Sequence, residues 1–289
     1  MSWLHLDVRS ASISAAALLM LALTARPWPH RWTRWISAAA YETGLVCALF
    51  ALWQVANGLT HTAHSGGISH GLAVWHAERW LHLPSETLLQ KLFIHQSWLV
   101  RAANYYYATA HLTGMFVFLV WLWLRHRDQY ARWRNVLVLF TGMALLIEMI
   151  PVAPPRLLPH TGLVDTAMAY GQSVYGFVGS DFADQYAALP SIHVGWAVLI
   201  GVAVWKSSTG MWRAVGACHA ALTIFVVVLT ANHYWLDAVA ASAVLALAMA
   251  GELGIRRLRS SRARSLGAGP ASDRCYTYPA TSGRATADR

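Results

Sequence analysis

The sequence predicts an all-α fold: a polytopic membrane helix bundle with six spans and a seventh left open. Two observations are compositional, since 56% of the 289 residues are hydrophobic and only 12% are charged, whereas a soluble domain is about a quarter charged. The third is the spacing of the charges, which leaves apolar windows of roughly 20 residues, the length of a membrane-crossing helix. The three cysteines, Cys47, Cys218 and Cys275, form no spaced framework, which argues against a secreted disulfide scaffold.

The first apolar segment, 10–25, lies between two arginines and is short for a span. A short span, an interfacial helix and an uncleaved signal-like segment all stay open for it. Six predicted spans follow, three without any charge and three with an acid near a boundary or an end, which is Glu42, Glu148 or Glu252. In chain order these spans cover 36–57, 102–124, 135–150, 185–205, 214–236 and 235–255.

These spans divide the chain into three parts. Residues 1–35 form an N-terminal segment with the additional candidate span, and 36–255 form the helix bundle. Residues 256–289 form a basic tail, in which the scarcity of large apolar side chains predicts disorder.

Two long loops connect spans on one side of the bundle. The loop 58–98 contains two segments rich in His and Trp, 68–82 and 86–98, which we expect to lie as helices in the membrane interface. The loop 151–190 is rich in Pro and Gly and carries acids, so it is too polar to enter hydrocarbon.

Arginine and lysine gather on the opposite side. Fourteen of the 22 basic residues fall in four short stretches: 26–35, 125–134, 206–213 and 256–264. Because such an excess marks cytoplasmic loops, we expect a multi-pass protein of the cell membrane with its tail in the cytoplasm and its two long loops outside. We therefore expect the basic residues to set the orientation in the membrane and to contact anionic lipid head groups, and we expect no nucleic-acid partner.

One outer stretch carries a candidate nucleophile and its partner. His233 and Asp237 are four residues apart, so on a helix they share a face, and the carboxylate can fix the imidazole tautomer and raise the basicity of its second nitrogen. A purely structural pair at a helix start is the alternative, because such spacings also arise by chance.

The other outer stretches are typical of an anion site. Pro190 suits a first helical turn, where the amide of Ile192 and the hydroxyl of Ser191 can bind an anion and His193 can donate a proton. Arg156 follows two prolines that stiffen its backbone, and a guanidinium binds phosphate oxygens well. A capped helix and an arginine at the head-group level are the structural alternatives. Together the residues describe phosphoryl transfer through a phosphohistidine, with no metal and no cofactor.

Two of these stretches also carry a family resemblance: Pro190-Ser191-Ile192-His193-Val194-Gly195-Trp196 and Asn232-His233-Tyr234-Trp235-Leu236-Asp237. They resemble the second and third motifs of the type 2 phosphatidic acid phosphatase superfamily, and the Ser-x-His and His-Tyr-x-x-Asp forms are similar to its inositol phosphorylceramide synthase-like branch. The stretch Ala153-Pro154-Pro155-Arg156 is similar to that branch's first motif. The resemblance covers roughly residues 100–255.

The resemblance implies a role for each matched residue. His233 would be the nucleophile, Asp237 its orienting partner and His193 the general acid, while Arg156, Ser191 and the amides around Ile192 would hold the phosphate. It implies a phospholipid or lipid phosphate substrate within the bilayer. Resemblance to the named branch favours transfer to an alcohol acceptor such as inositol, with a general lipid or polyprenyl phosphate phosphatase as the alternative.

A polar face of the span 102–124 predicts a head-group pocket or, alternatively, polar packing between helices; its members are Asn104, Tyr107 and His111. Two other classes of function remain open at this stage. A haem-binding electron carrier would need two facing histidines, for which His111 and His219 are the candidates. An inactive scaffold is the other, because Met149 and Val227 stand where the superfamily has phosphate-binding cations.

Overall fold

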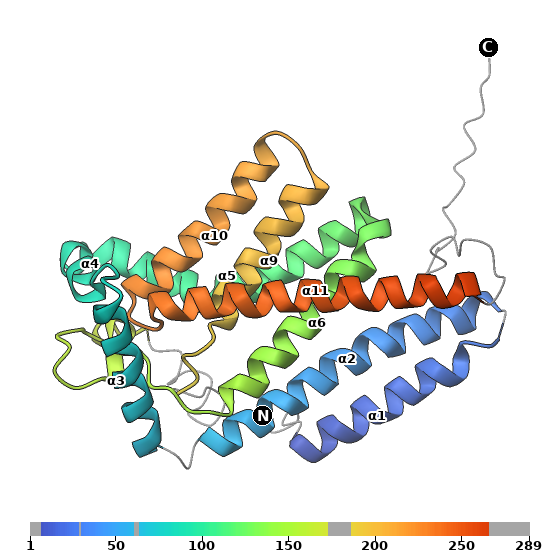
Figure 1. Cartoon of the computed structure of the whole chain (residues 1–289), viewed down its shortest axis with the longest axis horizontal. Helices are drawn as coiled ribbons and strands as arrows, with labels where there is room; N and C mark the ends of the chain where they lie inside the picture. Colours follow the sequence, from blue (N-terminus) through green and yellow to red (C-terminus); the bar gives the residue numbers. More distant parts are fainter. Residues whose placement is uncertain (1–6, 29, 61–63, 173–185, 266–289) are drawn as a thin grey trace.

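The computed structural model describes residues 7–28, 30–60, 64–172 and 186–265, and within these ranges it is helical with no strand (Figure 1). This confirms the predicted all-α class. Two irregular loop residues, Val152 and Ala187, form a single parallel bridge near the site described below.

The long helices form the body of the molecule. In chain order they are α1 (Val8–Ala25), α2 (Arg31–Thr60), α5 (Ser97–Arg125), α6 (Arg127–Glu148), α9 (Ile192–Ser207), α10 (Met211–Leu229) and α11 (Trp235–Ser265). Among the described residues, five helices are long and apolar enough to cross a membrane: α1, α2, α5, α10 and α11. The segment left open at 10–25 is therefore a helix of spanning length.

Three predicted boundaries differ from the structure. The span predicted at 185–205 begins as a helix only at Ile192, because Ser191 caps it. The span predicted to reach 236 ends at Leu229, since the chain turns through Ala231, whose φ is +54°. In the tail predicted to be disordered, residues 256–265 continue α11, because arginine and leucine are good helix formers; the rest of the tail lies outside the described residues.

Two predicted spans, α6 and α9, are not among these five helices. α6 is long enough with 22 residues, but its first two turns carry charged residues from Arg127 to Arg134. α9 has 16 residues and so measures only about 24 Å. Because α9 is shorter than its neighbours α5 and α10, its two ends cannot both lie level with theirs across the bundle.

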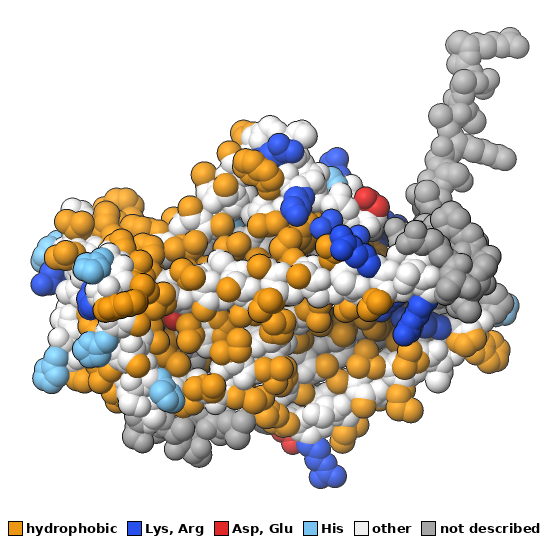
Figure 2. Space-filling model, in the orientation of Figure 1, with side chains coloured by type: hydrophobic (Ala, Val, Ile, Leu, Met, Phe, Trp, Pro, Cys, Tyr) orange, Lys and Arg blue, Asp and Glu red, His pale blue; other side chains and the backbone are white. Residues whose placement is uncertain are grey.

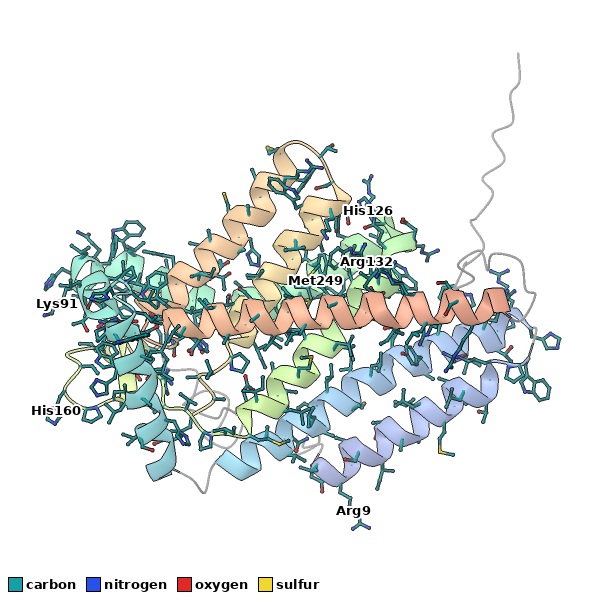
Figure 3. All side chains as sticks on the ribbon, in the orientation of Figure 1. Arg9, Lys91, His126, Arg132, His160 and Met249 are labelled. Atoms are coloured by element: carbon teal, nitrogen blue, oxygen red, sulfur yellow. The ribbon has the colours of Figure 1, made fainter. Side chains whose placement is uncertain are left out.

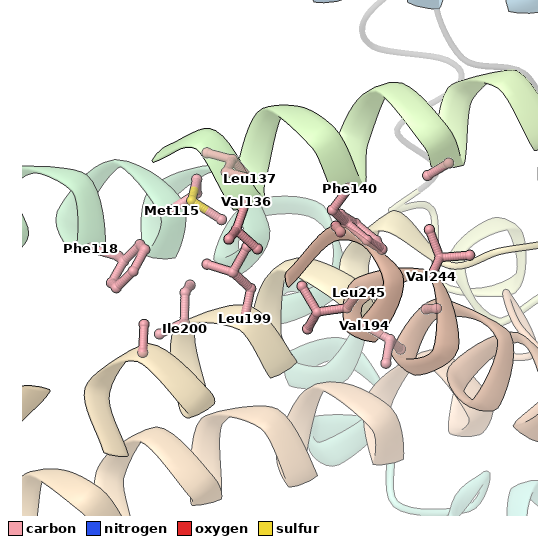
Figure 4. Packing of buried hydrophobic residues seen from close by; sticks show 14 of the residues in the cluster. Met115, Phe118, Val136, Leu137, Phe140, Val194, Leu199, Ile200, Val244 and Leu245 are labelled. Atoms are coloured by element: carbon pink, nitrogen blue, oxygen red, sulfur yellow. The ribbon is translucent and has the colours of Figure 1, made fainter. Parts of the chain in front are cut away.

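A core of large apolar side chains joins α5, α6, α9 and α11 (Figure 4). Phe140 of α6 lies directly against Gly195 of α9, where a Cβ atom would come within 1.8 Å of the ring. This contact sets the position of α9 two residues after His193. The α1–α2 hairpin packs on the outside of this core, mainly against α6.

Four further helical segments of the described chain cover one end of the bundle, on the left in Figure 1. They are α3 (His64–Trp80), α4 (Glu86–Phe93), the 3-10 turn η1 (Pro155–Leu157) and α7 (Thr166–Ala169). Helices were predicted at 68–82 and 86–98, and α3 and α4 occupy these segments. Figure 2 shows histidines gathered at this end and most of the visible arginines and lysines towards the opposite end, as predicted from the loop charges.

Candidate active site

His233 lies in the turn between α10 and α11, two residues before α11 begins. Its Nδ1 is 2.9 Å from the carbonyl oxygen of Ala188 and 3.2 Å from Oδ2 of Asp237. The pair was predicted to share a helix face. The structure instead brings it together across the start of α11, because the chain is still turning at His233 and only Asp237 is within the helix.

This environment determines the tautomer of His233. Two oxygen acceptors face Nδ1, so Nδ1 carries the proton and donates it. The other nitrogen, Nε2, is buried and has no hydrogen-bond partner among the described residues. His233 is 4% exposed, so its Nε2 lone pair lies within the protein interior.

Asp237 is fully buried and holds the turn as well as the imidazole. Its Oδ2 also accepts a hydrogen bond from the backbone N–H of Tyr234 at 2.9 Å. Tyr234 in turn donates its hydroxyl to the carbonyl oxygens of Ala153 (2.7 Å) and Gly71 (3.2 Å). A side chain at position 71 would collide with Ala153 O, so the close approach of α3 requires glycine there.

His193 is the second residue of α9, and its ring centroid is 5.6 Å from that of His233. Two residues of α5 contact the His193 ring. Tyr107 stacks on it with centroids 4.4 Å apart and an interplanar angle of 18°, and His111 packs against it at 4.2 Å. The structure therefore places Tyr107 and His111 against His193. A head-group pocket at this polar face stays a prediction.

The third residue of that face, Asn104, serves a different contact. It is buried, accepts a hydrogen bond from the Thr166 hydroxyl at 2.8 Å and donates to Oε1 of Gln172 at 3.2 Å. Asn104 thus attaches α5 to the outer loop, which is the packing alternative.

Arg156, in η1, is tied to the segment that carries His233. Its backbone N–H donates to Ala231 at 3.0 Å, and its guanidinium donates to Oδ1 of Asn232 and forms an ion pair with Asp165 at 3.2 Å. The side chain is 3% exposed. Asn232 lies inside the quoted motif, but no pattern in the sequence pointed to Asp165 as the partner of Arg156.

Ser191 is fully buried and caps α9, because its Oγ accepts the backbone N–H of Val194 at 3.2 Å. The hydroxyl hydrogen is still able to donate to a ligand. The amides of Ile192 and His193 belong to the first turn, where backbone N–H groups have no acceptor within the helix. The start of α9 therefore presents hydrogen-bond donors beside His193.

The geometry also bears on haem ligation and on metal binding. His111 packs against His193, whereas Nδ1 of His219 lies 2.9 Å from the hydroxyl of Tyr106, so the two rings considered for haem ligation engage different neighbours. Among the described residues, no three His, Cys, Asp or Glu side chains are grouped as a metal site would require.

Two imidazoles, a carboxylate and a guanidinium thus meet at one end of an apolar helix bundle, an arrangement suited to phosphoryl transfer at a membrane. Residues 72–251, more than half of the chain, match the sequence model of the PAP2 superfamily, and the chain belongs to this superfamily. Its members are phosphatases and phosphotransferases, so the protein is an enzyme of phosphatase-type phosphoryl transfer on lipid-like substrates. The match identifies the superfamily and not a branch within it. No curated protein and no solved structure gives a significant match.

Proposed function

We propose that the protein forms a phosphohistidine at His233 while it transfers or hydrolyses the phosphoryl group of a lipid phosphate or phospholipid head group. The observation that supports this most directly is Nε2 of His233, which is buried and unpartnered within the described part of the chain while Nδ1 is held by Ala188 and Asp237. A nucleophilic imidazole needs this combination of one anchored and one open nitrogen.

In this mechanism the Nε2 lone pair attacks phosphorus, and the bond from phosphorus to the lipid oxygen breaks. His193, whose ring is 5.6 Å from that of His233, donates a proton to the departing oxygen as general acid. In the second step a water or hydroxyl gives its proton to His193, attacks phosphorus and releases His233. Asp237 keeps the His233 ring oriented and stabilises its positive charge.

The phosphate oxygens would be held by the donors around them. Arg156 supplies a positive charge fixed in place by Asn232 and Asp165. The Ser191 hydroxyl and the amide of Ile192 lie at the positive end of α9. Tyr107 and His111 border His193 and form the side of the site nearest α5, where a head group would lie.

Hydrolysis and transfer differ only in whether water or an alcohol attacks the phosphohistidine. The Ser-x-His and His-Tyr-x-x-Asp forms favour transfer to an acceptor such as inositol. Purified enzyme would be given phosphatidic acid in detergent micelles with and without inositol. Transfer predicts inositol phosphate at the expense of inorganic phosphate, whereas inorganic phosphate alone identifies a general phosphatase.

The same assay tests independence from metal ions. Because the proposed nucleophile is an imidazole that needs no metal for activation, we expect activity to survive EDTA and to be inhibited by vanadate, which mimics five-coordinate phosphorus. A strict requirement for added magnesium or zinc would contradict the phosphohistidine mechanism.

We further propose that the site faces outside and the end of α11 faces the cytoplasm, because the arginines gather at the latter end. In a variant lacking the three native cysteines, a cysteine replacing exposed His160 (Figure 3) should react with an impermeant reagent in intact cells. A cysteine replacing Ser261 should react only after permeabilisation. The reverse pattern would place the site on the cytoplasmic face.

A further inference from the structure

Helices α3 and α4 bring two carboxyl groups into the outer end of the bundle. Glu78 of α3 and Glu86 of α4 are both 0% exposed. The nearby guanidinium of Arg79 lies 2.7 Å from Oε2 of Glu86 and 3.9 Å from Oε2 of Glu78. Two buried acids therefore share one arginine, and neither was singled out by the sequence.

The two acids also lie close to each other, since the same nitrogen of Arg79 contacts both. Oε2 of Glu78 and Oε1 of Glu86 are buried and have no hydrogen-bond partner in the described residues. Two buried anionic carboxylates beside a single arginine would leave an uncompensated buried charge, so one of them carries a proton. One proton and one arginine together leave the trio close to neutral.

Glu78 connects this pair to the proposed nucleophile. Its Oε1 accepts the backbone N–H of Leu236 at 2.8 Å, within the four-residue interval between His233 and Asp237. On the other side of the same turn, Trp235 donates its indole N–H to the carbonyl oxygen of Pro84 at 2.9 Å. The loop between α3 and α4 and the end of α3 thus hold the first turn of α11 in place.

The charges around Glu78 determine its protonation. α3 and α4 lie outside the spanning helices, and burial together with the neighbouring carboxyl groups of Glu86 and Asp237 raises the pKa of Glu78 to about 9. The Leu236 N–H opposes this shift. The remaining groups that face the pair are Arg79, already paired with Glu86, and the Tyr234 hydroxyl, whose pKa is raised mainly by burial.

We propose that Glu78 is a positioning residue that remains protonated against Glu86, and that the pair holds the first turn of α11 without adding negative charge beside Asp237. A second anionic carboxylate there would repel the phosphate that His233 attacks. Loss of the Leu236 contact would loosen the turn that aligns His233 with Asp237. This inference rests on the proposed role of His233.

Three variants separate the parts of this proposal. Glu78→Gln keeps the acceptor for Leu236 and is neutral, whereas Glu78→Ala removes the contact. Glu252→Gln, at the opposite end of α11, is the matched control for changing a buried carboxyl group, since Glu252 is 2% exposed.

Activity on phosphatidic acid would be measured from pH 6 to pH 10. We expect Glu78→Ala to lower kcat about tenfold with little change in KM, the scale of one lost hydrogen bond at a critical turn. Glu78→Gln should recover most of kcat and lack the alkaline fall in activity that the wild type and Glu252→Gln show near pH 9. Equal losses in Glu78→Ala and Glu78→Gln, or an unchanged alkaline fall in Glu78→Gln, would overturn the proposal.

An infrared measurement tests the proton directly, without relying on turnover. The wild type at pH 7.5 should show the carbonyl band of a protonated carboxylic acid that disappears in Glu78→Gln and persists in Glu252→Gln. No difference between wild type and Glu78→Gln would refute the proton-sharing pair. Absence of a phosphoenzyme at His233 would instead refute the proposed function and leave the infrared result intact.

Discussion

The buried acids at the two ends of α11 have different partners. At the inner end, Glu252 receives a hydrogen bond from Nε of Arg256 at 3.0 Å and has Arg132 of α6 at 4.0 Å. At the outer end, Asp237 faces an imidazole and backbone N–H groups, and Glu78 faces another carboxyl group. Two arginines thus face the single inner acid, whereas at the outer end Glu78 and Glu86 share one arginine, and Asp237 is held by an imidazole and a backbone N–H group.

This difference concerns stability, because unpartnered polar atoms at a site lower the stability of the folded protein. A buried polar atom without a partner costs about 1–3 kcal/mol. At the outer end these atoms include Nε2 of His233, just before α11, and Oδ1 of Asp237 in its first turn. Oε1 of Glu252 at the inner end has no hydrogen-bond partner in the described residues either, but it lies 2.8 Å from Nε of Arg256. An arginine ion pair would be a simpler way to secure a helix end, as the inner end demonstrates. We interpret the outer arrangement as one kept for a ligand.

The difference between the two ends is tested most strongly by changing one side chain at each end and measuring activity. His233→Ala should lower kcat by at least about 10⁴-fold, because loss of a covalent nucleophile removes the reaction path. Glu252→Gln should keep activity within about threefold per folded molecule and lower only stability, since it lies far along α11. Rates on phosphatidic acid, normalised to folded protein, would check both. Comparable losses at the two ends would make the distinction between them wrong.

Asp237→Asn should give the next largest effect, a loss of about 10³-fold in kcat. The amide can still occupy the space beside His233, but it lacks the charge that steadies a protonated or phosphorylated ring. It can also present its NH₂ group to Nδ1 and so favour the wrong tautomer. Steady-state kinetics on the same substrate measure this effect, and a loss under tenfold would remove Asp237 from the mechanism.

His193→Ala should cost about 10²-fold on phosphatidic acid, within the usual range for general acid catalysis. Its loss should be smaller on p-nitrophenyl phosphate, if this substrate is accepted, because the departing nitrophenolate needs no proton. His233→Ala should show no such recovery. Equal recovery of the two variants with the activated substrate would show that their roles are wrongly assigned.

The smallest effect concerns stability and pH. The pKa of Glu78 is raised from 4.5 to about 9, so between these values the folded protein holds a proton that the unfolded chain has lost. Stability should therefore fall as pH rises through this window and level off above about pH 9. Glu78→Gln carries no such penalty, so its Tm in detergent should exceed that of the wild type by about 2–4 °C at pH 8. A Tm difference that does not change between pH 5 and pH 8 would contradict the assignment.

Much of the fold could be predicted because charge and hydropathy dominate it. The charge-free windows anticipated α5 and α10, and the single acids did not obscure α2 or α11. The boundaries near the site were less accurate, because the turn at Ala231 and the late start of α9 at Ile192 depend on tertiary contacts. Hydropathy, a local property of the sequence, does not report such contacts.

The site itself was partly predictable. The motifs singled out His193, His233 and Asp237, and helical periodicity added Tyr107 and His111. These five residues lie close to one another in the structure. The same periodicity grouped Asn104 with them, but it could not indicate that Asn104 bonds Thr166 and Gln172, because these residues are distant in sequence.

The partners that sequence reasoning missed share one property. Glu78 and Asp165 lie on segments joined to the site only by folding, so no local pattern indicates Leu236 or Arg156 as their partners. Their charge gave no signal either, because an acid in a long polar loop is ordinarily solvated.

The most direct test of the central claim is to trap the phosphorylated enzyme during turnover. Wild type mixed with phosphatidic acid, quenched with alkali and digested, should yield a peptide with an acid-labile phosphate on His233. The modified peptide should be absent from His233→Ala and present in Glu252→Gln. A phosphate found on another residue, or turnover with no phosphorylated peptide in a quench fast enough to capture one, would contradict the account.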